Sequence, residues 1–132
     1  VIANGDTLFR ADLKKAWELH ITSEATCSLL LKPMKDFDRY GVVETNERGV
    51  VTLFREKQFY EKGNINGGLY ILNVHDLVDA GLPEKFSFEK DFLEAQFDKG
   101  QFRGILDDGY FIDIGIPDDY RRAQNEFKEF KY

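Results

Sequence analysis

The chain has 132 residues, 42% of them hydrophobic and 12 of them Phe, which is enough apolar mass for one ordinary domain core. Its net charge of −6 argues against a nucleic-acid partner, although an acidic protein can still hold a locally cationic pocket. Cys27 is the only cysteine, so no intramolecular disulfide can form, and a reducing cytoplasm is predicted. No apolar run approaches the roughly 18 residues that cross a bilayer, and no signal peptide is visible, so no membrane partner is predicted.

The first third of the chain alternates strand and helix patterns. Val1 to Ala3 is a short apolar strand, closed by the turn residues Asn4-Gly5-Asp6. Asp12 precedes an amphipathic helix over residues 13–20, and residues 25–31 read as a buried strand of a mixed or parallel sheet. Because the chain opens in an apolar strand without an initiator Met, we expect that a preceding portion is missing.

The middle of the chain predicts a hairpin and a third long strand. Residues 33–40 are polar and predict a turn. Two strands, 41–45 and 50–55, are joined by Asn46-Glu47-Arg48-Gly49, which is typical of a hairpin. Residues 65–72 predict a strand whose internal Gly67-Gly68 pair indicates a bulge or a close backbone approach.

The last part returns to alternating helices and strands. Helices are predicted over 74–80, over 87–97 after a Ser87 cap, and from Pro117 to the end of the chain. Two short strands, 102–106 and 110–114, flank an Asp-Asp-Gly turn. This alternation predicts an α/β layer fold with a mixed sheet.

Two acids stand where strands end. Asp6 follows the first strand, and Asp113 lies in Tyr-Phe-Ile-Asp-Ile-Gly-Ile-Pro. Ligands of open α/β sheets bind beyond the strand ends, and Mg²⁺ binds one or two carboxylates together with phosphate and water oxygens. Spacing alone leaves open a plainer reading, in which Asp6 caps a loop and Asp113 pairs with a base.

Six motifs, taken in order, resemble the second half of the sugar-1-phosphate nucleotidylyltransferase family, closest to guanylyltransferases of D-glycero-D-manno-heptose 1-phosphate or mannose 1-phosphate. They are Asn4-Gly5-Asp6-Thr7-Leu8-Phe9, Arg39-Tyr40-Gly41-Val42-Val43, Phe54-Arg55-Glu56-Lys57, Ile65-Asn66-Gly67-Gly68-Leu69-Tyr70, Phe86-Ser87-Phe88-Glu89-Lys90-Asp91 and Phe111-Ile112-Asp113-Ile114-Gly115-Ile116-Pro117-Asp118-Asp119-Tyr120. The resemblance covers essentially the whole chain.

The resemblance implies a fold and an activity. Residues 1–132 would be the C-terminal portion of a Rossmann-like, three-layer nucleotidyltransferase domain, with the N-terminal nucleotide-binding part absent. The implied reaction joins an NTP, with GTP favoured, to a sugar 1-phosphate and releases pyrophosphate. The family's glycine-rich triphosphate loop would lie upstream of Val1, so we expect this chain to be inactive alone and to self-associate, or else to come from a longer protein.

The resemblance also assigns roles to single residues. Asp6 and Asp113 match the two magnesium-holding aspartates, and Lys57 matches the base that meets the sugar phosphate; these three form the implied catalytic set. The sugar-contacting positions matched are Gly41, Glu56, Asn66 and Glu89. Gln58, Phe111 and Ile116 differ from the residues that are common in the family at these positions. These differences leave the subfamily and the substrate open.

Other candidates have weaker support. Asp36-Phe37-Asp38 has an acid-x-acid pattern, but no apolar strand precedes it, so a solvated loop is predicted. His20 and His75 lack metal-ligand spacing and predict surface or capping roles, and Cys27 predicts an inert core position. Two further functions stay open, a nucleotide-sugar-dependent glycosyltransferase and a non-catalytic sugar-nucleotide binding or regulatory module.

Overall fold

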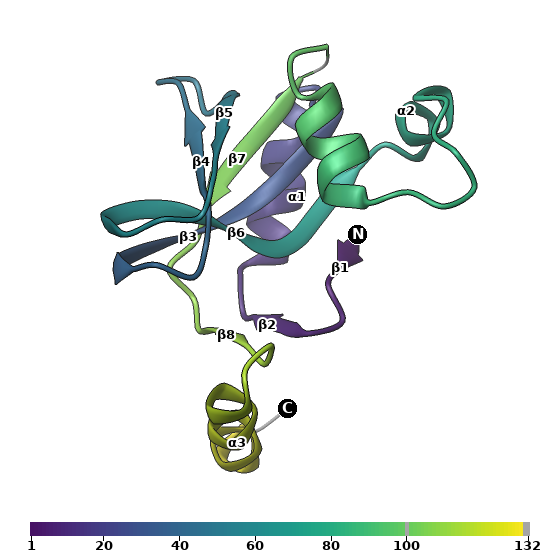
Figure 1. Cartoon of the computed structure of the whole chain (residues 1–132). Helices are drawn as coiled ribbons and strands as arrows, with labels where there is room; N and C mark the ends of the chain where they lie inside the picture. Colours follow the sequence, from purple (N-terminus) through teal and green to yellow (C-terminus); the bar gives the residue numbers. More distant parts are fainter. Residues whose placement is uncertain (100, 131–132) are drawn as a thin grey trace.

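A computed structural model describes residues 1–99 and 101–130, and its centre is a four-stranded mixed sheet (Figure 1). The long strands β3 (Cys27–Phe37) and β6 (Tyr60–Leu72) pair antiparallel in the middle. β1 (Ile2–Ala3) pairs antiparallel with β6 at one edge, and β7 (Phe102–Leu106) runs parallel to β3 at the other. The predicted α/β fold with a mixed sheet is confirmed.

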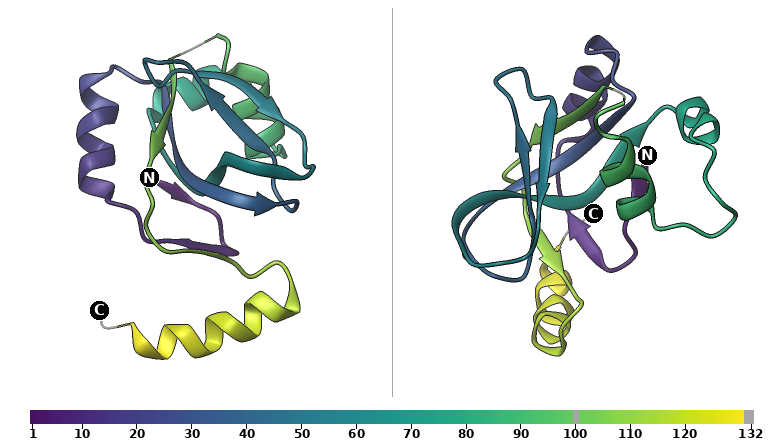
Figure 2. Two further views of the ribbon diagram at one scale, coloured as in Figure 1. Left: turned by 90° about the vertical axis from the view of Figure 1, so that its left-hand side faces the viewer. Right: turned by 45° about the horizontal axis from the view of Figure 1, so that its top comes forward.

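The sheet is covered on both faces, which explains the continuous apolar run of β3. Side chains alternate along a strand, so Leu29 and Leu31 pack into one core and Leu30 into another. On the Leu30 face lies α1 (Leu13–Thr22), whose N-cap Asp12 accepts a hydrogen bond from the Lys15 N–H at 3.0 Å. Figure 2 shows α1 on the opposite side of the sheet from the green helical segment that contains residues 88–94.

The face opposite α1 is covered by η1 and a hairpin. η1 (Phe88–Glu94) is a segment of π-helix capped by the Ser87 hydroxyl, and it buries Phe92 and Leu93. The predicted hairpin is confirmed as β4 (Val42–Thr45) and β5 (Val51–Arg55). The Asn46 carboxamide oxygen accepts hydrogen bonds from two backbone N–H groups within the turn, which fixes its shape.

A second, separate ladder lies beside the main sheet. β2 (Thr7–Phe9) and β8 (Phe111–Asp113) pair antiparallel, and α3 (Pro117–Glu126) follows β8. Figure 1 shows α3 standing away from the main sheet at the end of this ladder. An ion pair between Arg39 and Asp119 ties α3 back to the segment that follows β3.

Two strand boundaries differ from the sequence predictions. The turn expected over 33–40 is wrong, because β3 continues through Pro33 to Phe37. Beyond Leu31, no described strand pairs with the side of β3 that β7 occupies earlier. Pro33 has no N–H to donate, and at this unpaired edge none is needed, so the strand can continue through the proline. β6 begins at Tyr60 rather than 65.

The helices also differ in extent. α2 (Val74–Asp79) is close to its prediction. The last helix ends at Glu126 and is followed by the 3₁₀ turn η2 (Phe127–Glu129); residues 131–132, also predicted helical, lie outside the described part. Among the described residues, no helix has the length and apolarity to cross a membrane.

Candidate active site

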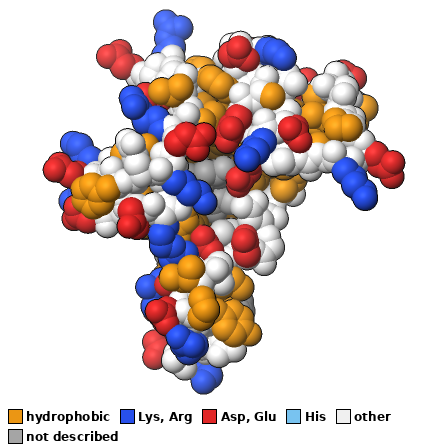
Figure 3. All heavy atoms as spheres, viewed as in Figure 1, with side chains coloured by type: hydrophobic (Ala, Val, Ile, Leu, Met, Phe, Trp, Pro, Cys, Tyr) orange, Lys and Arg blue, Asp and Glu red, His pale blue; other side chains and the backbone are white. Residues whose placement is uncertain are grey.

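An open cavity of about 720 Å³ is lined by residues of the main sheet, the β2–β8 ladder, the hairpin and η1. All seven residues singled out from the sequence line it: Asp6, Gly41, Glu56, Lys57, Asn66, Glu89 and Asp113. They come from six segments spread over more than a hundred positions of the chain. Figure 3 shows acidic and basic side chains interspersed across this view of the molecule.

The backbones of Asp6 and Asp113 lie next to each other. Thr7 is directly opposite Asp113 in the β2–β8 ladder, and the Ile114 N–H donates to the Asp6 carbonyl oxygen at 2.9 Å. The expectation that both acids end strands of one open sheet is wrong. Asp113 ends β8 and Asp6 immediately precedes β2, so both stand at one end of an antiparallel pair outside the main sheet.

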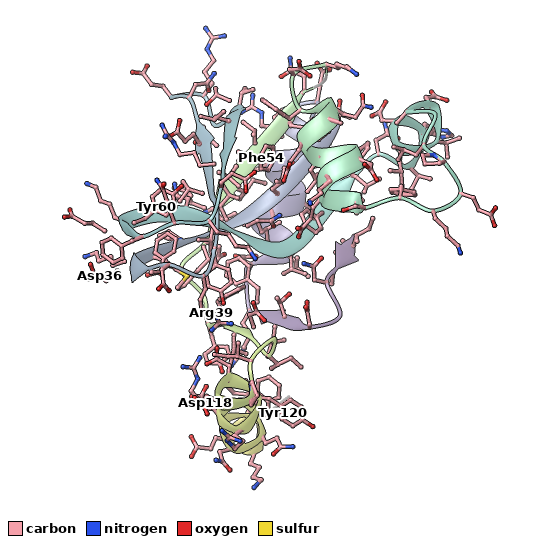
Figure 4. All side chains as sticks on the ribbon, viewed as in Figure 1. Asp36, Arg39, Phe54, Tyr60, Asp118 and Tyr120 are labelled. Carbon is pink, nitrogen blue, oxygen red and sulfur yellow. The ribbon has the colours of Figure 1, made fainter. Side chains whose placement is uncertain are left out.

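Asp113 is held from two sides. The Gly115 N–H donates to Asp113 Oδ1 at 2.6 Å, and Arg39 Nη2 lies 3.8 Å from Oδ2. Burial and then the neighbouring charge of Asp113 together raise the pKa of Tyr40 to about 12. Arg39 also pairs with Asp119, and Figure 4 shows Arg39 between the strands and α3. The carboxylate is therefore oriented before any ligand arrives.

The hairpin supplies the next group of lining residues. Glu56 and Lys57 directly follow β5, their side chains are exposed, and Lys57 forms no ion pair with any described residue. A side chain at Gly41 would collide with the Arg55 carbonyl oxygen, so this position has a packing reason to be glycine. Lys57 is thus a cation facing the cavity.

Asn66 and Glu89 approach the cavity from β6 and η1. The Asn66 Oδ1 accepts a hydrogen bond from the Gly68 N–H at 3.0 Å. Between Leu29 and Leu31 the β3–β6 register shifts, and Gly68 has a φ of +71°, so the predicted irregularity at Gly67-Gly68 is confirmed. Glu89 Oε1 lies 3.5 Å from the Asn4 amide nitrogen and 3.4 Å from the Tyr70 hydroxyl.

The donor set fits a magnesium-type ion. No cluster of three or more His, Cys, Asp or Glu side chains with metal-binding geometry occurs among residues 1–99 and 101–130. A dedicated zinc or calcium cage would need more ligands, whereas Mg²⁺ is commonly held by one or two carboxylates with water and substrate phosphate completing its shell. Asp6 and Asp113 supply that number at one cavity.

The acidic pair, the two histidines and the cysteine noted in the sequence lie outside the cavity. Asp36 and Asp38 are exposed as expected, but Asp36 belongs to β3 rather than to a loop. The surface or capping role expected for His20 is wrong: the ring is buried between α1 and β3, with Nδ1 2.9 Å from the Ser28 hydroxyl. His75 is exposed, and burial raises the pKa of the Cys27 thiol to about 12, as expected of inert core.

Sequence reasoning gave no role to two residues that shape the site. Arg39 and Tyr70 both lie within quoted motifs, yet their partners stand far away in the chain. Arg39 pairs with Asp119, 80 positions on, and Tyr70 contacts Glu89, 19 positions on. A signal for Arg39 existed, because it is the first residue of the Arg-Tyr-Gly motif beside two cavity-lining neighbours.

The chain belongs to the nucleotidyl transferase family, whose sequence model matches residues 1–129. It is 54% identical over 130 residues to the D-glycero-α-D-manno-heptose 1-phosphate guanylyltransferase of Aneurinibacillus thermoaerophilus, covering 98% of this chain and 56% of that protein. It is 47% identical to the enzyme of the same name from Campylobacter jejuni, covering 90% of this chain and 52% of that one. The chain therefore spans about half the length of the curated relatives that it matches.

A solved structure agrees with the family assignment. The crystal structure of HddC from Yersinia pseudotuberculosis aligns with a TM-score of 0.80 and 35% identity, covering 95% of this chain and 53% of that one. The same protein complexed with GMP-PN aligns with a TM-score of 0.77. The chain thus has the Rossmann-like fold of nucleotidyltransferases over the part that it spans.

Proposed function

We propose that this chain supplies the metal and sugar-phosphate side of an enzyme that transfers a guanylyl group from GTP to a manno-configured sugar 1-phosphate. The observation that carries the proposal is the convergence of all seven sequence-selected residues on one cavity of about 720 Å³. The relatives named heptose 1-phosphate guanylyltransferase support the choice of nucleotide and sugar, since their identities of 54% and 47% exceed the 32% to a glucose-1-phosphate adenylyltransferase.

In the proposed reaction, a phosphate oxygen of the sugar 1-phosphate attacks the α-phosphorus of GTP, and the bond to pyrophosphate breaks. Such a transfer depends on positioning and charge neutralisation rather than on a protein nucleophile. Lys57 would hold the sugar phosphate as a point charge, which keeps the attacking oxygen in line. Asp6 and Asp113 would hold Mg²⁺, which when bound supplies neutralisation of the phosphate oxygens.

The sugar would be recognised by polar groups on the hairpin side and the η1 side of the cavity. The Glu56 and Glu89 carboxylates can accept hydrogen bonds from sugar hydroxyls, the Asn66 carboxamide can accept or donate, and Gly41 lines the same cavity. Each hydroxyl left without a partner costs about 1–3 kcal/mol, so fixed polar groups can select one sugar configuration. The nucleotide base and triphosphate would be bound by the half of the relatives' length that this chain does not match.

The test is direct binding by the chain itself in the presence of Mg²⁺. Calorimetric titration with α-D-mannose 1-phosphate and D-glycero-α-D-manno-heptose 1-phosphate should show binding, with α-D-glucose 1-phosphate weaker. GTP added alone should bind far more weakly than either manno-configured sugar phosphate. Tighter binding of a complete nucleotide sugar, together with hydrolysis or transfer of its sugar, would favour the glycosyltransferase function instead.

A cytoplasmic location stays a prediction, because it rests on the single cysteine of the sequence.

A further inference from the structure

A buried tyrosine hydroxyl contacts Glu89, one of the residues that line the cavity. Tyr70 stands near the C-terminal end of β6, paired with Ile2 of β1 on one side and Leu29 of β3 on the other. Its side chain is 0% exposed, and its ring packs edge-on against Phe88 with the centroids 4.9 Å apart. The ring is therefore fixed on both strand sides and from η1.

The polar end of this side chain points at the cavity wall. The Tyr70 hydroxyl donates to Glu89 Oε1 at 3.4 Å. Burial raises the pKa of Tyr70 and the charge of Glu89 raises it further, so the phenol stays protonated and can donate. Buried tyrosine hydroxyls normally require such a partner.

Glu89 has few contacts that would hold its side chain in one orientation. Its side chain is exposed at the start of η1, and apart from Tyr70 its other hydrogen-bond partner within the described residues is the Asn4 amide at 3.5 Å. A glutamate side chain that is free to rotate loses rotamer entropy when a ligand fixes it. A rigid hydrogen-bond donor that already holds the side chain lowers this entropy cost of ligand binding.

We propose that Tyr70 is a positioning residue, whose hydroxyl holds the Glu89 carboxylate in the orientation that receives a sugar hydroxyl. The inference rests on the proposed function, since it takes Glu89 as a sugar contact. Tyr70 itself does not line the cavity. Its effect therefore reaches the ligand only through the Glu89 side chain.

The experiment is the Tyr70→Phe substitution, which keeps the ring and its packing and removes one oxygen atom. The chain's affinity for α-D-mannose 1-phosphate, measured by calorimetry, should fall about fivefold. Its affinity for inorganic phosphate should stay unchanged, because that probe has no sugar hydroxyls. Tyr110→Phe is the matched control: it also loses a hydroxyl bonded to a glutamate, Glu126, but away from the cavity, and both affinities should stay as in the unaltered chain.

A second substitution separates this inference from the proposed function. Glu89→Gln should weaken mannose 1-phosphate binding, and adding Tyr70→Phe to it should weaken binding little further, since both changes act through one side chain. If Glu89→Gln weakens binding and Tyr70→Phe does not, Tyr70 has no positioning role although the proposed function stands. If Tyr70→Phe weakens both probes equally, its role is structural. Absence of mannose 1-phosphate binding by the unaltered chain would overturn the proposed function and this inference together.

Discussion

Asp113 is the residue whose charge the proposed reaction uses most directly. Asp113→Asn keeps an oxygen that can accept from the Gly115 N–H, so the local fold should persist. In the assembled enzyme the substitution should lower kcat by at least about tenfold in saturating magnesium, because it removes charge needed in the transition state. Asp118→Asn is the control, since Asp118 is exposed on α3 and pairs with Arg121. An unchanged kcat for Asp113→Asn would remove Asp113 from the metal site.

Lys57 is the residue proposed to hold the sugar phosphate. Lys57→Met keeps most of the aliphatic stem and removes the charge, so packing and charge can be told apart. The KM for the sugar phosphate should rise about tenfold or more while the KM for GTP changes little. Lys85→Met provides a control on an exposed lysine that does not line the cavity. Equal effects on both substrates would refute the assignment.

At this scale the sequence predicted the location of the site but not its support. The residues selected from motifs in chain order all line one cavity, although these motifs end within strands, η1 and α3 as well as in loops. The supporting contacts were out of reach, since Tyr70 reads as an ordinary core residue of an apolar strand. His20 shows the same limit: its burial depends on Ser28 across the α1–β3 interface, and no local pattern encodes that pairing.

The α1–β3 interface should make the stability of the protein depend on pH. Burial lowers the pKa of His20 below its ordinary value of 6.5, so the folded state favours the neutral ring. Below pH 6.5 the unfolded chain gains a proton that the folded chain resists, so this contribution is complete above 6.5 and is lost as the pH falls further. The melting temperature of the unaltered chain should therefore fall more steeply on acidification than that of His20→Gln. Parallel curves would show that His20 does not contribute.

The hairpin β4–β5 depends on a glycine for a reason separate from any ligand. A methyl group at Gly41 would collide with the backbone carbonyl of Arg55, which cannot move without disturbing strand pairing. Gly41→Ala should destabilise the ligand-free chain by about 1–3 kcal/mol. Gly5→Ala is the matched control, because a methyl group there meets no atom within 4 Å. Thermal melting without ligand is the measurement, and equal melting temperatures for both variants would contradict the packing argument.

The elements themselves were predicted better than their ends. Alternation and turn residues located the hairpin and the strand–helix order. Pro33 misled the prediction, because proline in a polar stretch indicates a turn unless its missing N–H falls on an unpaired edge. The separation of β8 from β7 was equally hidden: strands on either side of a short turn usually pair, whereas here β7 joins β3 and β8 joins β2.

In the whole molecule, the proposed metal ligands and the proposed sugar contacts line one cavity from two different groups of elements. The β2–β8 ladder and α3 form one side, and the main sheet with η1 and the hairpin forms the other (Figure 1). Arg39 links them through Asp113 and Asp119. In the proposed reaction, this arrangement would let the sugar phosphate and the metal meet between two separately supported surfaces.

The proposed role of this chain as one half of a guanylyltransferase active site can be tested by pyrophosphate release from GTP, a manno-configured sugar 1-phosphate and Mg²⁺. The chain would be assayed alone and then mixed with the portion of the Aneurinibacillus relative that it does not match. We expect no turnover by the chain alone and pyrophosphate release by the mixture, which Asp113→Asn should suppress. Full turnover by the chain alone would refute the proposal, because the triphosphate site would then lie within these 132 residues.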